Sequence, residues 1–136
     1  MFWPFTKTKR KVAASAEIAS GLVAVQLALG GTDLITIFKA KDYFALGYVL
    51  GAHGGACQAT GIPHDSEAEF RVFAIGYQVL AESQAQEILE WSLSAQRNER
   101  FHDGAGFGGQ QVIEFLRDKK NPVGLAKHLN SHAYAT

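Results

Sequence analysis

Four glycines within one apolar segment set the strongest constraint on how this chain can fold. Gly47, Gly51 and Gly55 recur at intervals of four residues, and Gly54 precedes the last of them. This spacing places three glycines on one stripe of a helix that we predict over residues 43–60. Each interior glycine costs a helix about 0.8–1 kcal/mol relative to alanine. A helix that carries such a stripe therefore needs a compensating contact that only small residues permit.

The stripe has two interpretations. Small residues at intervals of four let two helix backbones approach closely, either inside one chain or across a homodimer. Alternatively, the missing side chains leave room for a bound ligand or for a partner's helix. We therefore predict a surface for helix packing or a ligand cavity at four residues: Gly47, Gly51, Gly54 and Gly55.

Apolar periodicity predicts a helix before this segment. Apolar residues recur there at spacings of four, four, three and four, which is one face of a helix. We expect this face to point into the core, and it consists of Ala14, Ile18, Leu22, Val25 and Leu29. The segment Leu34–Phe38 is expected to be helical after a cap at Thr32 or Asp33, because no second strand is available to pair with it.

Capping signals predict the helices that follow. Ser66 and Glu69 form a capping box, and so do Ser83 and Gln86, with a break near Glu82 between the two helices. The expected core positions of the first of these helices are Phe70, Phe73, Ala74, Tyr77 and Leu80.

The C-terminal third is expected to hold a loop and two short helices. Four glycines among the eight residues 102–109 predict the loop. A helix over 110–120 follows, and Asn121-Pro122 then predicts a last helix that ends near residue 129. With short connections throughout, the prediction is an all-α compact bundle of about five to seven helices, in a single domain over residues 12–136.

Residues 1–11 are expected to form a separate N-terminal arm, because Pro4 discourages a helix there. Aromatic and basic residues side by side suit contact with an anionic membrane surface or with a partner. These residues are Phe2, Trp3, Phe5, Lys7, Lys9, Arg10 and Lys11. The apolar stretch that follows is expected neither to span a membrane nor to act as a signal peptide, because Glu17 interrupts it.

Charge and cysteine content exclude some classes of protein. The formal net charge is zero, so no global positive field draws in nucleic acid. The single cysteine, Cys57, rules out a disulfide framework within the chain and fits a reducing compartment. We expect a cytoplasmic protein, with the basic arm as a point of peripheral membrane contact.

His53 and Cys57 are the candidate metal ligands. They lie four residues apart on the predicted glycine-rich helix, so both side chains could face one ion. Zinc needs at least three protein ligands, and His64, Asp65 or Glu67 would have to complete the set. The sequence names no other cofactor.

The glycines at 104–109 match the spacing of a dinucleotide-binding fingerprint. That fingerprint requires a preceding strand and a βαβ unit, neither of which is expected here. His102 beside Asp103 suggests acid–base chemistry, but no nucleophile motif accompanies the pair. We therefore expect a non-catalytic helical interaction or regulatory protein that associates with itself through the glycine-rich helix. The alternative is a small-ligand or metal-binding domain that uses His53 and Cys57, and a small enzyme centred on His102 comes third.

Overall fold

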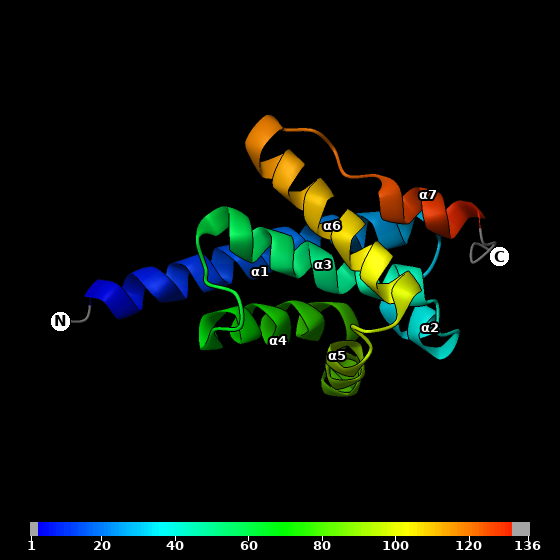
Figure 1. The fold of residues 1–136 in the computed structure, drawn as a ribbon, viewed down its shortest axis with the longest axis horizontal. Helices are drawn as coiled ribbons and strands as arrows, with labels where there is room; N and C mark the ends of the chain where they lie inside the picture. The colour runs from blue at the N-terminus through cyan, green and yellow to red at the C-terminus, as the bar shows by residue number, and fades with distance from the viewer. Residues whose placement is uncertain (1–2, 132–136) are drawn as a thin grey trace.

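Seven α-helices with short connections make up residues 3–131, the part of the chain that the computed structural model describes; the side chains of residues 3–6 are not described (Figure 1). The described residues contain no strand, so the fold is all-α as predicted. In order, the helices are α1 (Trp3–Leu29), α2 (Leu34–Lys39), α3 (Tyr43–Thr60), α4 (Glu67–Ala81), α5 (Ala85–Ser94), α6 (Glu99–Asp118) and α7 (Gly124–Ser131).

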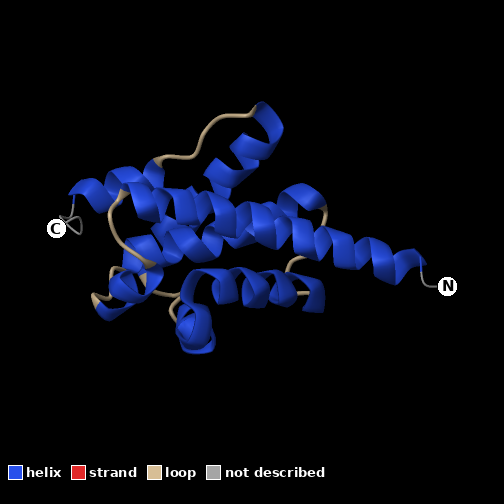
Figure 2. Ribbon diagram, turned by 180° about the vertical axis from the view of Figure 1, so that it is seen from behind, coloured by secondary structure: helices blue, strands red, loops and turns tan. Residues whose placement is uncertain are grey.

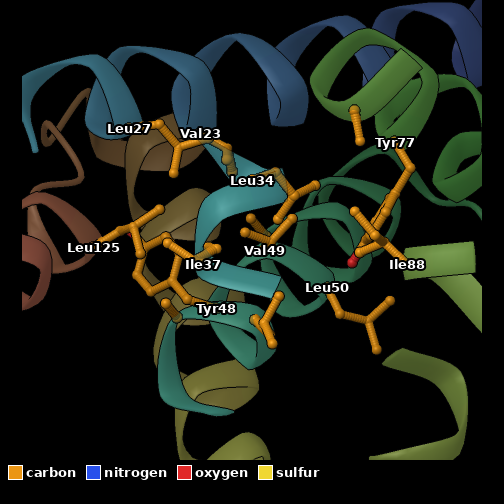
Figure 3. Packing of buried hydrophobic residues seen from close by; sticks show 14 of the residues in the cluster. Val23, Leu27, Leu34, Ile37, Tyr48, Val49, Leu50, Tyr77, Ile88 and Leu125 are labelled. Carbon is orange, nitrogen blue, oxygen red and sulfur yellow. The ribbon is translucent and has the colours of Figure 1, made fainter. Parts of the chain in front are cut away.

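Helix α3 lies at the centre, and the other helices pack around it. Figure 1 shows α6 crossing in front of α3, α1 behind it, and α4 with α5 below. Large buried side chains from all seven helices meet in one core cluster, which includes Phe101 of α6. Figure 3 shows part of this cluster. Tyr48, Val49 and Leu50 bring three successive positions of α3 into this cluster. The central helix is therefore buried around most of its circumference, as expected of a helix that is apolar on every face.

The first helix begins earlier than the sequence suggested. Helix α1 starts at Trp3, so residues 3–11 are helical and continuous with the rest of α1, although Pro4 was expected to discourage a helix there. Pro4 lies in the first turn, where its missing N–H removes no hydrogen bond from the helix. Figure 2 shows the N-terminal end of α1 extending beyond the other helices. Residues Lys7–Leu29 are long and apolar enough to cross a membrane by length and composition, but 44% of the apolar window is buried in this structure.

The buried face of α1 is also not the predicted one. Val25 is 60% exposed and Leu29 is 64% exposed, and Ala14 is exposed as well. The opposite face packs against α3 and α4, and it carries Val12, Ala16, Ala19, Val23 and Leu27. From Ile18 onward, apolar residues occur on every side of α1, so periodicity alone does not select a face. The smaller side chains allow the closer approach to the neighbouring helices.

Local caps begin α2, α3, α4 and α6 as helix physics requires. Asp33 accepts a hydrogen bond from the amide of Thr36 at 2.8 Å, which confirms the helical interpretation of Leu34–Phe38. Asp42 caps α3, and Ser66 caps α4 by accepting from the amide of Glu69 at 3.1 Å. These side chains satisfy amide groups that have no partner within their own helix.

Helices α4 and α5 differ from the prediction in detail. Phe70 is 52% exposed and Ala74 is exposed, whereas Val72 and Gly76 are buried beside the expected Phe73 and Tyr77. The predicted break near Glu82 is present as a short 3-10 turn over Glu82–Gln84. The second capping box is not, because α5 starts at Ala85 without a side-chain cap.

The predicted loop over residues 102–109 is helical and lies inside α6, which Asn98 caps with a bond of 3.0 Å to the amide of Phe101. Its glycines are compensated by the contact with α3 described below. Helix α7 starts two residues after Pro122, and Gln26 of α1 accepts hydrogen bonds from its Leu125 and Ala126 amides at 2.9 and 3.1 Å. A buried glutamine thereby takes the place of an N-cap residue.

Candidate functional site

The glycine stripe of α3 packs directly on the backbone of α6. A Cβ atom added at Gly51 would lie 2.5 Å from the carbonyl carbon of Ala105, and one added at Gly55 would lie 2.5 Å from the carbonyl oxygen of Gly109. Gly47 meets the backbone of Phe101 in the same way. Any side chain at these positions would push the two helices apart, so the stripe holds a backbone-to-backbone contact.

The contact is reciprocal. Gly104 and Gly108 of α6 face the backbones of Phe44 and Tyr48 of α3 at equally short range. The residues that we expected in a loop therefore supply the partner of the α3 stripe. Because α6 covers Gly47, Gly51 and Gly55 within the same chain, a second copy has no access to them in this structure. Self-association through this stripe would require α6 to leave.

An open groove runs beside the paired helices. Its volume is about 780 Å³, within the range of ligand sites in proteins. The groove is bounded by α3, the α3–α4 connection, α4, the end of α5 and α6. Small residues line the floor, namely Gly51, Gly54, Gly55, Ala105, Gly106 and Gly109, and the larger apolar side chains are Leu50, Ile62, Phe73, Leu93 and Ile113. The amides of Gln58, Gln96 and Gln110 add hydrogen-bonding groups.

Two of the floor glycines have no steric reason among the residues that the structure describes. A Cβ atom added at Gly54 or at Gly106 would have no neighbouring atom within 4 Å. Both residues are helical and both line the groove. They differ in this respect from Gly51, whose contact with α6 excludes a side chain. The prediction grouped Gly54 with the stripe, but its surroundings are those of the groove.

A histidine and two carboxylates lie at one end of the groove. Ligand atoms of His64, Asp65 and Glu69 lie within 4.8 Å of one another, and the described residues contain no other such group of three. His64 and Asp65 have side-chain exposures of 82% and 85%, whereas Glu69 has 8%. Glu69 accepts a hydrogen bond from the Asp65 amide at 3.0 Å, so it also supports the start of α4. Glu67, which the sequence offered as a ligand, instead pairs with Arg71 at 2.8 Å.

His53 does not face this group. Its ring is fully buried between α3 and α4, with the ring centroids of Tyr77 and Phe73 at 5.3 and 6.5 Å. The Nδ1–H group donates to the carbonyl oxygen of Val49 at 2.7 Å, and Nε2 has no hydrogen-bond partner among the described residues. Nε2 lies against Gly76, where an added side chain would collide with the ring. Burial lowers the pKa of His53 to about 4, so the ring is neutral at pH 7.

Cys57 has different neighbours from His53. It packs in a small separate cluster with Val12, Ala16, Ile62 and Val72. Burial, together with the charge of Glu69, raises the pKa of the Cys57 thiol to about 12. A thiol at neutral pH in this setting is a poor nucleophile and a poor metal ligand. Among the described residues, no group of three ligands includes His53 or Cys57.

The remaining candidate residues lie on α1 and α6. Lys7, Lys9, Arg10 and Lys11 are exposed on α1, while Phe2 and the side chains of Trp3 and Phe5 lie outside the described residues. His102 and Asp103 are exposed near the start of α6.

Sequence reasoning did not find the groove or the partner role of α6, although Gly104 and Gly108 repeat the spacing of four that drew attention to α3. No protein family, curated protein or solved structure matches the chain.

Proposed function

We propose that this chain is a non-catalytic helical interaction protein whose groove between α3, α4 and α6 receives an apolar segment of a protein partner. The observation that carries the proposal is the pair Gly54 and Gly106. Each glycine costs its helix about 0.8–1 kcal/mol relative to alanine, and no neighbouring atom of the described residues requires either of them. A partner whose backbone or side chains approach the groove floor closely would offset that cost.

The shape and the lining of the groove favour a protein segment. The groove is open to solvent, so a segment of another chain can reach it from outside. Apolar side chains such as Leu50, Phe73 and Ile113 offer contacts to an apolar face, and the Gln58 and Gln110 amides suit backbone groups at the edge. The carboxylates of Asp65 and Glu69 line the groove near the start of α4, and they favour a basic residue at that point of the partner.

The state of the two chemically versatile side chains supports a non-catalytic role. Burial keeps the pKa of His53 near 4 and that of Cys57 near 12. An effective general base has a pKa close to the working pH, and an effective cysteine nucleophile has a lowered one. The pKa of His53 is too low for a general base at neutral pH, and the pKa of Cys57 is raised instead of lowered.

Filling the groove tests the proposal. The tagged full chain is used to capture partners from cell extract, in parallel with a variant that carries Gly54→Leu and Gly106→Leu. Ala74→Leu is the matched control, because Ala74 is an exposed helical residue on α4 that lines neither this groove nor the smaller one beside α1. A partner that is retained by the wild type and the control but lost by the groove variant supports the proposal. Equal capture by all three proteins would show that the groove is not the binding surface.

A second candidate is the binding of a metal ion, favoured by the cluster of His64, Asp65 and Glu69. Zinc accepts histidine nitrogen and carboxylate oxygen as ligands, and three protein ligands leave a fourth position for water. We expect zinc to raise the melting temperature of the wild type and to leave His64→Ala unchanged. If zinc leaves the melting temperatures of both proteins unchanged, the role of the cluster is limited to capping α4.

The cytoplasm remains the proposed location, on the basis of the single buried cysteine. The exposed basic residues at the start of α1 are the proposed point of any peripheral membrane contact. A fusion of the full chain to a fluorescent protein, followed by fractionation, tests both statements.

A further inference from the structure

The outward face of α1 is an apolar helix surface that the other described helices do not cover. Its central stripe runs through Arg10, Ala14, Glu17, Gly21, Ala24 and Ala28, all of them exposed. The spacings alternate between four and three residues, which is the repeat that keeps one side of a helix against a partner helix. Residues 18–29 contain no charged side chain. An exposed helix face of this composition is typical of an interaction site.

A shallow groove lies beside this stripe and enlarges the surface. It measures about 340 Å³ and is formed by small residues and Glu17 of α1 together with Ile75 and Val79 of α4. Ile75 is 44% exposed and Val79 is 62% exposed, and a Cβ atom at Gly21 would have no neighbour within 4 Å. Val25 and Leu29 add further exposed apolar side chains on α1. The surface thus combines a floor of small residues with larger side chains on both sides.

The charges on the stripe identify the occupant. Arg10 and Glu17 lie seven residues apart on the same face of α1. Neither forms an ion pair with another described residue. If a second α1 lies antiparallel with its midpoint at residues 13 and 14, each Arg10 meets the Glu17 of the other copy. The two-fold axis therefore forms the same Arg10–Glu17 ion pair twice, once on each side of the axis. The small Ala14 lies where the two helices cross.

We propose that two copies of this chain pair through the outward faces of their α1 helices, antiparallel and centred on Ala14. In this register, residues 3–10 of one copy run alongside residues 17–24 of the other. The projecting N-terminal end of α1 has the room to do this, because it extends beyond its own bundle (Figure 2). The pairing is independent of the groove between α3 and α6.

A membrane surface is the main competing occupant, and Glu17 argues against it. The carboxylate sits on the exposed stripe between Ala14 and Gly21, so insertion of this face into lipid would bury a negative charge without a partner. The dimer instead supplies an arginine to that carboxylate. Lys7, three residues before Arg10, continues the stripe and runs alongside residue 20 of the other copy in this register.

A charge exchange tests the pairing and its register together. The dissociation constant of the full chain is measured by analytical ultracentrifugation for the wild type, Arg10→Glu, Glu17→Arg and the double variant. Each single change places like charges opposite each other, and we expect it to weaken the dimer about tenfold or more. The double variant restores opposite charges and should return to within about threefold of the wild type. A monomeric wild type, or single variants that dimerise as well as the wild type, would overturn the proposal.

Cysteine crosslinking provides a second measurement of the register. In a Cys57→Ala background, Ala14→Cys places the new thiol next to the two-fold axis, where the two copies should form an intermolecular disulfide on oxidation. Gly21→Cys is the control, because its two copies lie far from the axis in this register. Crosslinking through residue 21 and not through residue 14 would contradict the proposed pairing.

Sedimentation of a monomeric wild type with anionic vesicles would assign the face to a membrane instead. Loss of the dimer with partner capture intact would separate this inference from the proposed function.

Discussion

Replacing Gly51 by alanine should destabilise the protein, even though alanine is the better helix former. The added Cβ atom would lie 2.5 Å from the carbonyl carbon of Ala105 and 2.6 Å from its Cα atom. Carbon atoms that are not bonded to each other prefer separations of about 3.5–4.0 Å. The obstacles are backbone atoms of α6, so no side chain can rotate out of the way. The helices must separate by about 1 Å at this point to relieve the contact.

The separation would spread along the whole helix pair. Gly47 faces α6 one turn earlier and Gly55 one turn later, so contacts on both sides of residue 51 would loosen together. Overpacking of an interior costs about 1–3 kcal/mol, and backbone obstacles place this case near the upper end. Alanine regains about 1 kcal/mol through its helix propensity. We therefore expect the free energy of unfolding to fall by about 2 kcal/mol.

Urea denaturation followed by far-UV circular dichroism measures this change, provided that the m-value stays constant. Gly54→Ala is the matched control, because it lies on the same helix and its added Cβ atom would have no neighbour within 4 Å. It should gain up to about 1 kcal/mol. The two variants thus move stability in opposite directions. If Gly51→Ala were as stable as the wild type, the close contact between α3 and α6 would be refuted.

Three further predictions concern single side chains. Burial holds the pKa of His53 at about 4 against its usual 6.5, so its contribution to stability is complete above pH 6.5 and is lost as the pH falls toward 4. The loss is up to about 3 kcal/mol, and urea denaturation at several pH values should show less pH dependence for His53→Gln. Gln26→Leu leaves two buried amides of α7 without acceptors and should cost about 2–3 kcal/mol, with faster hydrogen exchange in α7 than elsewhere. Ser66→Ala should cost about 1 kcal/mol in thermal or urea unfolding, whereas Ser83→Ala, at a position without a cap bond, should stay within about 0.5 kcal/mol of the wild type.

Local chemistry made several elements predictable. The caps at Asp33, Asp42 and Ser66 act within three residues of themselves, so the sequence is sufficient to find them. The helix over 43–60 has the predicted bounds, with Gly61 in the left-handed conformation at its end. The capping box predicted at Ser83 does not form, although Ser83 and Gln86 have the same spacing as Ser66 and Glu69. The 3-10 turn occupies residues 82–84, and α5 begins directly after it with Ala85 and Ile88 buried.

The glycines of α6 show the limit of local reasoning. In isolation, the residues from Gly104 to Gly109 favour a loop, because each glycine disfavours a helix by about 1 kcal/mol. In the fold they are helical, since α3 offers a matching row of small residues along which the two backbones touch. The outcome depends on two segments that lie about fifty residues apart in the sequence. A short stretch of sequence, such as local prediction uses, contains only one of these two segments.

The sequence by itself determined that the chain is all helical, where several of the helices start, and that the glycines of α3 need a close neighbour. Only the tertiary structure decided which neighbour that is, which side of α1 faces outward, and where a groove remains open. Capping and periodicity are properties of a few adjacent residues. The choice of face and partner depends on the sum of many packing contacts between distant segments, so it is settled only when all the helices come together.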